Sequence, residues 1–236
     1  MKRVSVLVAA VLWAVAAVQA RNPPGQPVQQ PPAGQTPPQG QPPQGPPPGQ
    51  QPGPPLGPNT WTIDSNHTSA QFSVRHLMVS TVRGTLGRVS GTVDYDGKSL
   101  DSVKADVTID VAGLNTGTEG RDKDLRSPNF FDVGNYPTIT FKSKRVEPAG
   151  SGRFKLIGDL TIHGVTKEVT LDVEGPSPPL KQPNGALKIG ATATTKLNRR
   201  DFNLNYNRVV EAAPVVGDEI NVTIDIELNK RPTGTQ

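Results

Sequence analysis

Cysteine is absent from this chain of 236 residues. Its absence excludes a disulfide framework, a thiolate metal site, a catalytic thiol and a lipid-modified N-terminal cysteine. A folded domain in this chain must therefore be held together by its hydrophobic core and not by covalent cross-links.

A strong excess of one charge is also missing. The formal net charge is +4 at pH 7, and basic and acidic residues are interspersed along the chain. A nucleic-acid partner usually requires a concentrated basic face. We therefore expect no nucleic-acid partner.

Long apolar runs are scarce, and the one that stands out is N-terminal. Met1, Lys2 and Arg3 precede an apolar run over residues 4–18, and small residues follow near Ala20. This is the layout of a secretory signal peptide, and the run is too short to span a bilayer core of roughly 30 Å. We expect a signal peptide over residues 1–20 and a periplasmic or secreted mature protein without stable membrane insertion. An uncleaved signal anchor is the alternative.

The next segment, residues 21–58, has almost no sizeable apolar side chains. It consists largely of proline, glutamine and glycine, and residues 22–58 carry no charge. Such a composition buries too little apolar surface to offset the entropy lost on ordering. We predict a disordered linker here and a disordered tail over residues 231–236. The linker is interpreted as a spacer; a ligand for a proline-binding domain and a contact with the cell envelope are the alternatives.

Residues 59–230 have the pattern of a single β-rich domain. Apolar and polar residues alternate with a period of two, which indicates half-buried strands. Glycine-rich and asparagine-rich turns separate these runs and favour an antiparallel meander. The predicted strands are residues 61–64, 70–76, 87–95, 103–111, 138–145, 154–162, 169–173, 187–193 and 220–228.

One segment interrupts the strands. Residues 119–127 are rich in charge and in good helix formers, and Pro128 follows them directly. Because proline disfavours the helical conformation of the residue before it, the helix should end there. We predict a short helix near the open end of a barrel.

About eight strands with one apolar face can form a sandwich or a closed barrel. An eight-stranded barrel can be filled by side chains or can hold one small ligand. Small residues on the inward faces would leave room, or they would face Phe72, Phe141 and Phe154 across a packed interior. The pattern alone does not decide between these. The small inward residues are Ala70, Gly91, Ala105, Gly158, Ala191 and Ala193.

Five segments carry a resemblance to a known family. Residues 158–171 read GDLTIHGVTKEVTL, which resembles the signature G-x-L-T-I-x-G-V-T-K-x-V-T-L of the YceI-like family. Four further segments are similar to the same family in the same order, so the resemblance covers the whole predicted domain. They are residues 64–76 (DSNHTSAQFSVRH), 124–141 (DLRSPNFFDVGNYPTITF), 198–202 (NRRDF) and 216–228 (VGDEINVTIDIEL).

The resemblance implies an all-β fold, an eight-stranded antiparallel lipocalin-like barrel with a short helix near one end. It also implies an exported bacterial protein that binds a long-chain isoprenoid, such as an isoprenoid quinone or a prenyl pyrophosphate, or a similar amphiphile. Two positions depart from the family. Asn203 stands where glycine is common, and asparagine tolerates the left-handed conformation that such a turn needs. The loop at residues 212–214 also differs, which leaves the shape of that rim open.

For such a carrier we predict an apolar lining that takes the tail out of water. Each Å² of apolar surface removed from water contributes roughly 25 cal/mol, less the entropy lost when the tail is ordered. The predicted lining residues are Phe72, Val74, Val89, Val93, Val107, Ile109, Phe141, Phe154, Leu160, Leu171, Ile189 and Ile224.

Polar groups near the head group would provide discrimination. His76 shares a strand face with Phe72 and Val74, so it should point inward, as a ligand contact or as a core histidine satisfied by a carbonyl. Arg121, Arg199 and Arg200 suit an anionic head group, and a structural ion pair with Asp201 is the alternative for the last two. For His67 we expect a structural hydrogen bond.

We predict no catalytic residue, no metal ligand and no cofactor, and hence no enzyme. The three histidines (His67, His76 and His163) have no compact metal-ligand spacing, and no Gly-x-Ser-x-Gly elbow or phosphate-binding glycine loop occurs. Two other functions remain as alternatives: a β-rich interaction module displayed on the proline-rich stalk, and a hydrolase whose residues converge in space. The sequence leaves open which lipid is bound and whether a homodimer forms.

Overall fold

The structure is a computed structural model that describes residues 56–206, 209–210 and 213–232. The predicted signal peptide and the predicted linker up to residue 55 lie outside the described residues, as do residues 233–236 of the predicted tail. No helix in the described part of the chain is long and apolar enough to cross a membrane.

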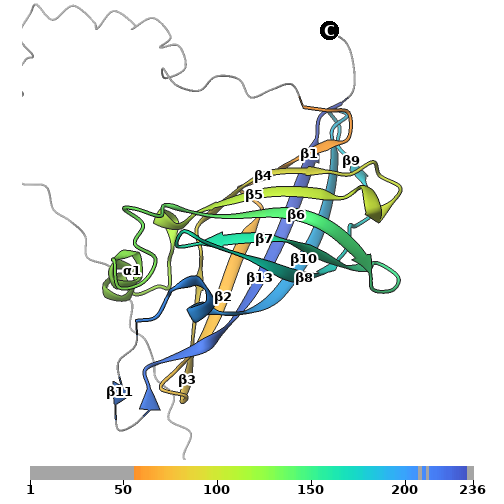
Figure 1. The fold of residues 1–236 in the computed structure, drawn as a ribbon. Coiled ribbons are helices and arrows are strands. Elements are labelled where there is room, and N and C mark those ends of the chain that lie inside the picture. Colours follow the sequence, from red (N-terminus) through yellow and green to blue (C-terminus); the bar gives the residue numbers. More distant parts are fainter. Residues whose placement is uncertain (1–55, 207–208, 211–212, 233–236) are drawn as a thin grey trace, which may run out of the picture. The chain divides into compact units, whose positions relative to one another are not determined.

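The described region is built almost entirely of strands (Figure 1). A single α-helix, α1 (Glu119–Arg126), lies between β5 and β6, and the short 3-10 helices are η1 (Leu100–Ser102), η2 (Val111–Gly113) and η3 (Arg199–Phe202). In chain order the strands are β1 (Thr60–Ile63), β2 (Ser69–His76), β3 (Ser80–Thr85), β4 (Arg88–Asp94), β5 (Lys104–Asp110), β6 (Thr138–Pro148), β7 (Arg153–Ile162), β8 (Val165–Glu174), β9 (Leu180–Lys181), β10 (Leu187–Asn198), β11 (Val209–Val210), β12 (Ala213–Pro214) and β13 (Val216–Lys230).

One antiparallel sheet closes on itself. Its order is β3-β2-β13-β1-β4-β5-β6-β7-β8-β10-β9, and the additional pairing of β13 with β10 closes it. β1 and β2 pair one after the other along the same side of β13, and β4 and β3 continue next to them, so each of these pairs acts as one interrupted strand. With β9 as a short addition to β10, the barrel has eight strands. The predicted fold class is confirmed.

The strength of the pairing varies around the barrel. β10 pairs with β13 at twelve positions and β7 pairs with β8 at ten, whereas β8 pairs with β10 at only three, Thr192 to Thr194 opposite Glu174 to Asp172. The wall between β8 and β10 is therefore a seam with few backbone hydrogen bonds.

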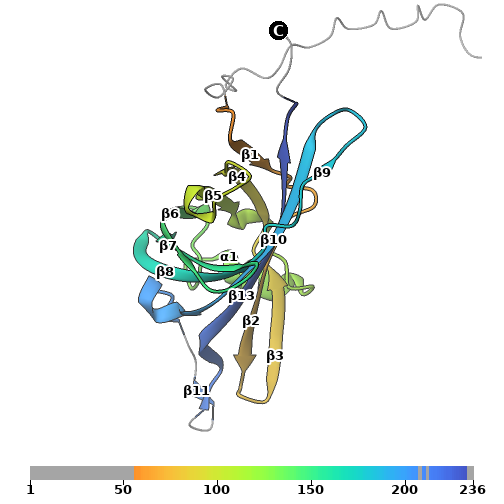
Figure 2. The ribbon, with the colours of Figure 1, turned by 90° about the vertical axis from the view of Figure 1, so that its right-hand side faces the viewer.

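β3 was not among the predicted strands. Its sequence STVRGT contains one large apolar side chain, Val82, so it lacks the alternation that identified the others. β2 and β3 form a hairpin that extends from one end of the barrel, while the β9–β10 hairpin extends from the other (Figure 2).

Helix α1 matches its prediction to within one residue and lies beside one end of the sheet (Figure 1). Only one of its residues, Leu125, is a large apolar one, so polar contacts hold it in place. The Asp122 carboxylate accepts hydrogen bonds from the Thr116 backbone N–H (2.8 Å) and hydroxyl, and Arg126 donates to the Leu114 carbonyl. The hydrogen bonds from Thr116 lower the pKa of Asp122 below its ordinary value.

Candidate functional site

The barrel interior contains a cavity. Its volume is about 140 Å³, and one water molecule needs roughly 10–15 Å³ of such space. The interior is therefore not filled from end to end. The lining residues are Leu86, Val93, Tyr95, Val103, Ala105, Val107, Ile109, Ile139, Phe141, Phe154, Leu156, Leu160, Ile162, Leu171, Val173, Pro176, Ile189, Ala191, Ala193, Thr195, Leu197, Val222, Ile224, Ile226 and Leu228.

The wall of this main cavity is almost wholly apolar. Within the described part of the chain, Tyr95 and Thr195 are the only lining residues with a polar side-chain atom, and none of the lining residues is charged at neutral pH. A guest in this space can be held by apolar burial and dispersion but has almost no hydrogen-bond partner.

The small inward residues divide between the two roles left open by the sequence. Ala105, Ala191 and Ala193 line the main cavity. Gly158 is not part of the wall of the main cavity. A Cβ built on it would lie 2.4 Å from the Lys142 carbonyl oxygen and 2.7 Å from Cζ of Phe141. The alanines thus leave room, whereas this glycine lets an aromatic ring and the neighbouring backbone approach closely.

A second apolar cavity continues the first. Its free space is about 100 Å³ by the same measure, and its wall includes Phe72, Val74 and Leu125 of helix α1. Among the described residues, five aliphatic ones belong to the walls of both cavities, so the two cavities adjoin inside the barrel at these side chains. We call this set the constriction: Leu86, Ile139, Ile162, Leu197 and Val222.

Beyond the second cavity lies a pocket with polar edges, here called the mouth. It shares Phe72, Val74, Leu125, Phe130 and Val216 with the second cavity. Among the described residues, the second cavity has one charged side chain in its wall, Arg199, whereas six polar side chains line the mouth, so a guest could keep its tail in the cavities and its head group among polar groups. The polar residues of the mouth are Arg75, His76, Arg121, Asp124, Asn129 and Tyr206.

Most of the predicted lining residues border one of these spaces. Phe72 and Val74 line the second cavity and the mouth, while Val89 is 0% exposed in the packed core and borders none of them. Contact of these residues with a lipid stays a prediction. The predicted residues that line the main cavity are Val93, Val107, Ile109, Phe141, Phe154, Leu160, Leu171, Ile189 and Ile224.

The structure brings two of the predicted head-group residues together, because His76 and Arg121 both line the mouth. Arg121 donates through Nε to the Thr116 hydroxyl (2.7 Å) and through Nη2 to the Thr116 carbonyl (2.9 Å). These hydrogen bonds fix the guanidinium at the edge of the mouth, on the first turn of α1.

Arg199 borders the second cavity, and hydrogen bonds within the protein engage most of its guanidinium. It is 4% exposed, and its guanidinium donates to the carbonyls of Gly217, Leu204 and Tyr206 and to the Asp218 carboxylate. Four of the five guanidinium N–H groups are thus engaged. Burial lowers the pKa of Arg199 from its ordinary value, and the neighbouring Asp218 opposes that shift.

Arg200 is half exposed and forms an ion pair with Asp218 at 2.8 Å. A structural ion pair with Asp201 is the alternative that the sequence offers for Arg200. The ion pair is present, but its partner is Asp218. The 3-10 helix η3 turns the chain back against the start of β13, where Asp218 lies. Asn203 ends this helix in the left-handed conformation (φ 59°), as expected.

The constriction was not singled out from the sequence. Ile162 and Ile139 lie on predicted strands, but Leu86 falls in the break between β3 and β4, where no alternation identifies an inward position. Only the closure of the barrel shows that these residues lie at the boundary between the two cavities.

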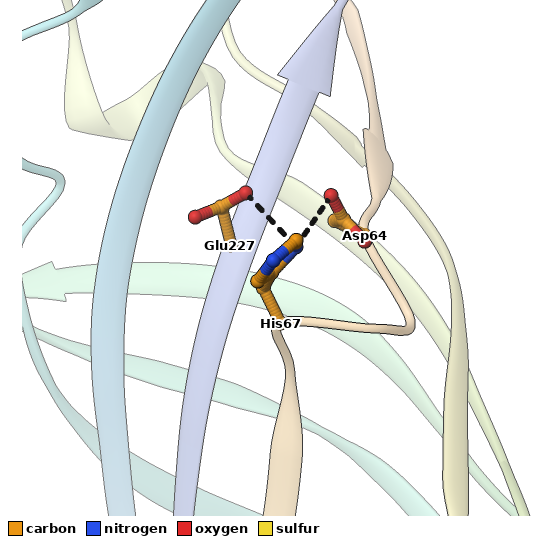
Figure 3. Close-up of side chains that lie close together, drawn as sticks. All are labelled: Asp64, His67 and Glu227. Atoms are coloured by element: carbon orange, nitrogen blue, oxygen red, sulfur yellow. Dashed lines mark hydrogen bonds and ion pairs between the residues drawn. The ribbon is translucent and has the colours of Figure 1, made fainter.

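A separate group of titratable side chains lies near the start of β2 (Figure 3). Ligand atoms of Asp64, His67 and Glu227 all lie within 4.8 Å of one another. His67 Nδ1 lies 3.0 Å from Asp64 Oδ2, which is the structural hydrogen bond expected for it. We call these three residues together with Lys188 and Asn229 the charged network.

Lys188 provides the positive charge of this network. Its ammonium contacts Glu227 and lies 3.4 Å from Asp64 Oδ2, to which the Asn229 amide also donates at 3.0 Å. Hydrogen bonds from His67 and Asn229 hold the pKa of Asp64 far below its ordinary value, and the Glu227 carboxylate raises the pKa of Lys188. The network joins the turn after β1 to β10 and β13, and because Lys188 already forms an ion pair with each of the two carboxylates, we interpret it as a structural cluster.

Comparison with known proteins gives a consistent family. The profile of the YceI-like domain matches residues 61–228. A UPF0312 protein of Staphylococcus aureus is 35% identical over 156 residues, which cover 66% of this chain and 88% of that protein. A UPF0312 protein of Vibrio parahaemolyticus is 34% identical over 178 residues, covering 74% of this chain and 89% of that protein.

Solved structures show the same barrel. The YceI protein of Campylobacter jejuni superposes with a TM-score of 0.58 at 34% identity, covering 66% of this chain and 90% of that one. A polyisoprenoid binding domain from Saccharophagus degradans, implicated in plant cell wall breakdown, superposes with a TM-score of 0.54 at 15% identity, covering 71% of this chain and 97% of that one. At that identity the second likeness concerns the fold alone.

Proposed function

Because the chain belongs to the YceI-like family, we propose that it binds a long-chain isoprenoid or a similar amphiphile inside its barrel. The tail occupies the main cavity and the second cavity, and the head group lies at the mouth. An isoprenoid quinone and a prenyl pyrophosphate are the two cargo classes that fit this arrangement. The binding of a polyisoprenoid by the related domain from Saccharophagus degradans supports the proposal.

The apolar hollow carries this proposal. A wall of aliphatic and aromatic side chains that leaves about 140 Å³ of free space would be costly for a protein that needed only a packed core, because unfilled space forfeits dispersion contacts. An apolar tail recovers those contacts and leaves water at the same time. Since each contact is weak and nonspecific, the tail sets the affinity and discriminates little.

The mouth supplies the discrimination. His76 has a ring N–H that can donate to a quinone carbonyl or to a phosphate oxygen, and Arg121 offers a guanidinium, which matches phosphate oxygens in shape and charge. Both residues line the same pocket. A pyrophosphate head group would use both side chains, whereas a quinone would use mainly the histidine.

Binding rather than catalysis is the activity that the cavity supports. Catalytic sites bring together titratable groups with shifted pKa values. Those residues of the main cavity's wall that the structure describes offer only the Tyr95 hydroxyl as a titratable group. We further propose that the chain is exported and that it sequesters or transports its cargo in the periplasm or outside the cell.

The test is extraction of the purified full chain with organic solvent, followed by mass spectrometry. We expect close to one prenyl lipid per chain. Ala193→Phe, which adds an aromatic ring to the cavity wall, should reduce the bound lipid at least about tenfold, because the ring takes the space of several methylenes. Thr194→Phe is the matched control, since it adds the same ring to the next, exposed position of β10.

Two results would contradict the proposal. One is an extract without lipid combined with no uptake of added prenyl lipid by the folded protein. The other is equal lipid content in Ala193→Phe and Thr194→Phe, which would show that the guest does not occupy the cavity.

A further inference from the structure

The tip of the β2–β3 hairpin exposes apolar side chains to solvent. Met78 is 55% exposed and Val79 is 81% exposed, and they follow the half-buried Leu77 directly. We call these three residues the apolar tip. Their exposure is unfavourable in water and adds nothing to the barrel core, so packing within the chain does not account for them.

The backbone of the apolar tip is also strained. Leu77 and Met78 have positive φ angles of 51° and 56°, and the Val79 N–H donates to the His76 carbonyl at 3.0 Å, which closes a tight turn. Asparagine and glycine are favoured at such positions, because a large side chain in the left-handed conformation is crowded against its own backbone. The turn therefore has bulky apolar residues where folding alone favours small ones. Such strain is often kept for function.

The apolar tip is flanked by positive charge. Arg75 and Arg83 are exposed on β2 and β3, and no acidic residue occurs between Asp64 and Asp94. Arg75 donates to the Met78 carbonyl (2.6 Å) and to the Thr81 hydroxyl (3.1 Å), so its guanidinium is held directly below the tip. On the neighbouring strand β13, the carboxylates of Asp218 and Glu219 are paired with Arg200 and Lys196.

The apolar tip also lies next to the mouth. Phe72, Val74, Arg75, His76 and Val82 of the same hairpin line that pocket. His76, which lines the mouth, directly precedes the apolar tip in the chain. The mouth therefore lies beside this hairpin, which extends from one end of the barrel (Figure 2).

We infer that the β2–β3 hairpin docks the protein on the surface of an anionic lipid bilayer. Met78 and Val79 enter the region between head groups and acyl chains, and Arg75 and Arg83 lie among the anionic head groups. This contact turns the mouth towards the membrane, so that an apolar tail can pass between bilayer and barrel with little exposure to water. The inference rests on the proposed function for the cargo, but the docking can be measured without cargo.

The experiment is sedimentation of the full chain with vesicles that contain no isoprenoid, either of phosphatidylcholine alone or with phosphatidylglycerol added. We expect binding to the anionic vesicles that weakens as the salt concentration rises. The double variant M78S/V79S should lose about tenfold or more in affinity, since two apolar side chains no longer leave water. Arg83→Gln should lose about fivefold on anionic vesicles.

Leu180→Ser is the matched control. Leu180 is 63% exposed and lies on β9, on the hairpin at the opposite end of the barrel. We expect its vesicle affinity to equal that of the parent chain. All variants share the same N-terminal segment, so any contribution of that segment to binding cancels.

Met78→Gly separates docking from stability. Glycine relieves the positive φ at this position, so Tm should rise by about 2–4 °C while vesicle affinity falls. If Met78 served the fold instead, its replacement would lower Tm together with vesicle affinity.

The inference is overturned by an unchanged affinity of M78S/V79S, by an equal loss in Leu180→Ser, or by no binding of the parent chain to anionic vesicles. The last result would make a protein the occupant of the apolar tip. Vesicle binding that depends on Met78 and Val79, in a folded chain that yields no extractable lipid and takes up no added prenyl lipid, would support docking while contradicting the carrier proposal.

Discussion

The two ends of β13 differ in how they use polar and apolar side chains. Near Glu227 the charged network and the fully buried Trp61 hold the strands together, and the Trp61 indole donates to the Tyr95 carbonyl at 3.0 Å. Eleven positions earlier, roughly 36 Å away at ~3.3 Å per residue, Val216 borders the mouth. There the hairpin leaves apolar groups in solvent. We call the end near Glu227 the closed end, because its side chains hold the strands together, and the end near Val216 the access end, because it borders the mouth.

The largest effect should come from breaking the closed end. Trp61→Ala removes the largest fully buried side chain, and replacement of a buried tryptophan by alanine costs about 3–5 kcal/mol. Denaturant unfolding should show a loss of this size in the free energy of unfolding. A loss below about 1 kcal/mol would mean that this end contributes little to closure.

A negative charge introduced into the cavity wall at the access end should weaken the binding of lipid. Phe72→Asp places a carboxylate in the wall shared by the second cavity and the mouth, so uptake of a prenyl lipid should weaken by about tenfold or more, equivalent to about 1.5–3 kcal/mol. Titration with a fluorescent prenyl lipid measures this. Gln71→Asp is the control, because Gln71 is exposed on the opposite face of the same strand. Unchanged uptake in a folded Phe72→Asp chain would mean that this face does not meet the guest.

Arg121→Gln sharpens the comparison at the head group. The variant keeps hydrogen-bonding capacity at the mouth but loses the positive charge, so affinity for a prenyl pyrophosphate should fall by about tenfold while affinity for a quinone stays nearly constant. Competition between the two lipids for one labelled lipid tests both at once. Equal losses for the two cargo classes would argue for a structural role of Arg121 in α1.

The smallest effect concerns the pH dependence of the closed end. The folded-state pKa of Asp64 lies below its ordinary value of 3.8, so ionised Asp64 stabilises the fold above that pH, and the contribution is lost as the pH falls towards the folded-state value. Asp64→Asn should cost about 1 kcal/mol at pH 6. The difference in Tm from the parent chain should shrink between pH 4 and 2.5. A difference that stays constant over this range would contradict the assignment.

The alternating strands could be predicted because each has one face towards the interior and one towards solvent. Val222 is buried and its neighbour Asn221 is exposed, for example. β3 could not, since Val82 alone does not make a pattern. Helix α1 was predictable from its composition and from Pro128, a local signal.

The site was predictable in part. Inward positions follow from strand alternation, so most of the cavity lining could be named. Strand alternation does not reveal which residues meet across neighbouring strands of the closed barrel. Asp64 and Glu227 meet only because β1 lies beside β13, and Arg200 meets Asp218 because η3 folds back. Such contacts depend on strand register, which a single sequence does not reveal.

The seam between β8 and β10 has a consequence for how the wall can deform. Three paired positions connect these strands, against ten between β7 and β8. Local opening is least costly where few backbone hydrogen bonds must break. We therefore expect the barrel to widen along this seam when a branched chain enters and to return to its original width when that chain leaves. In amide hydrogen exchange, the seam should show the fastest exchange of the barrel wall.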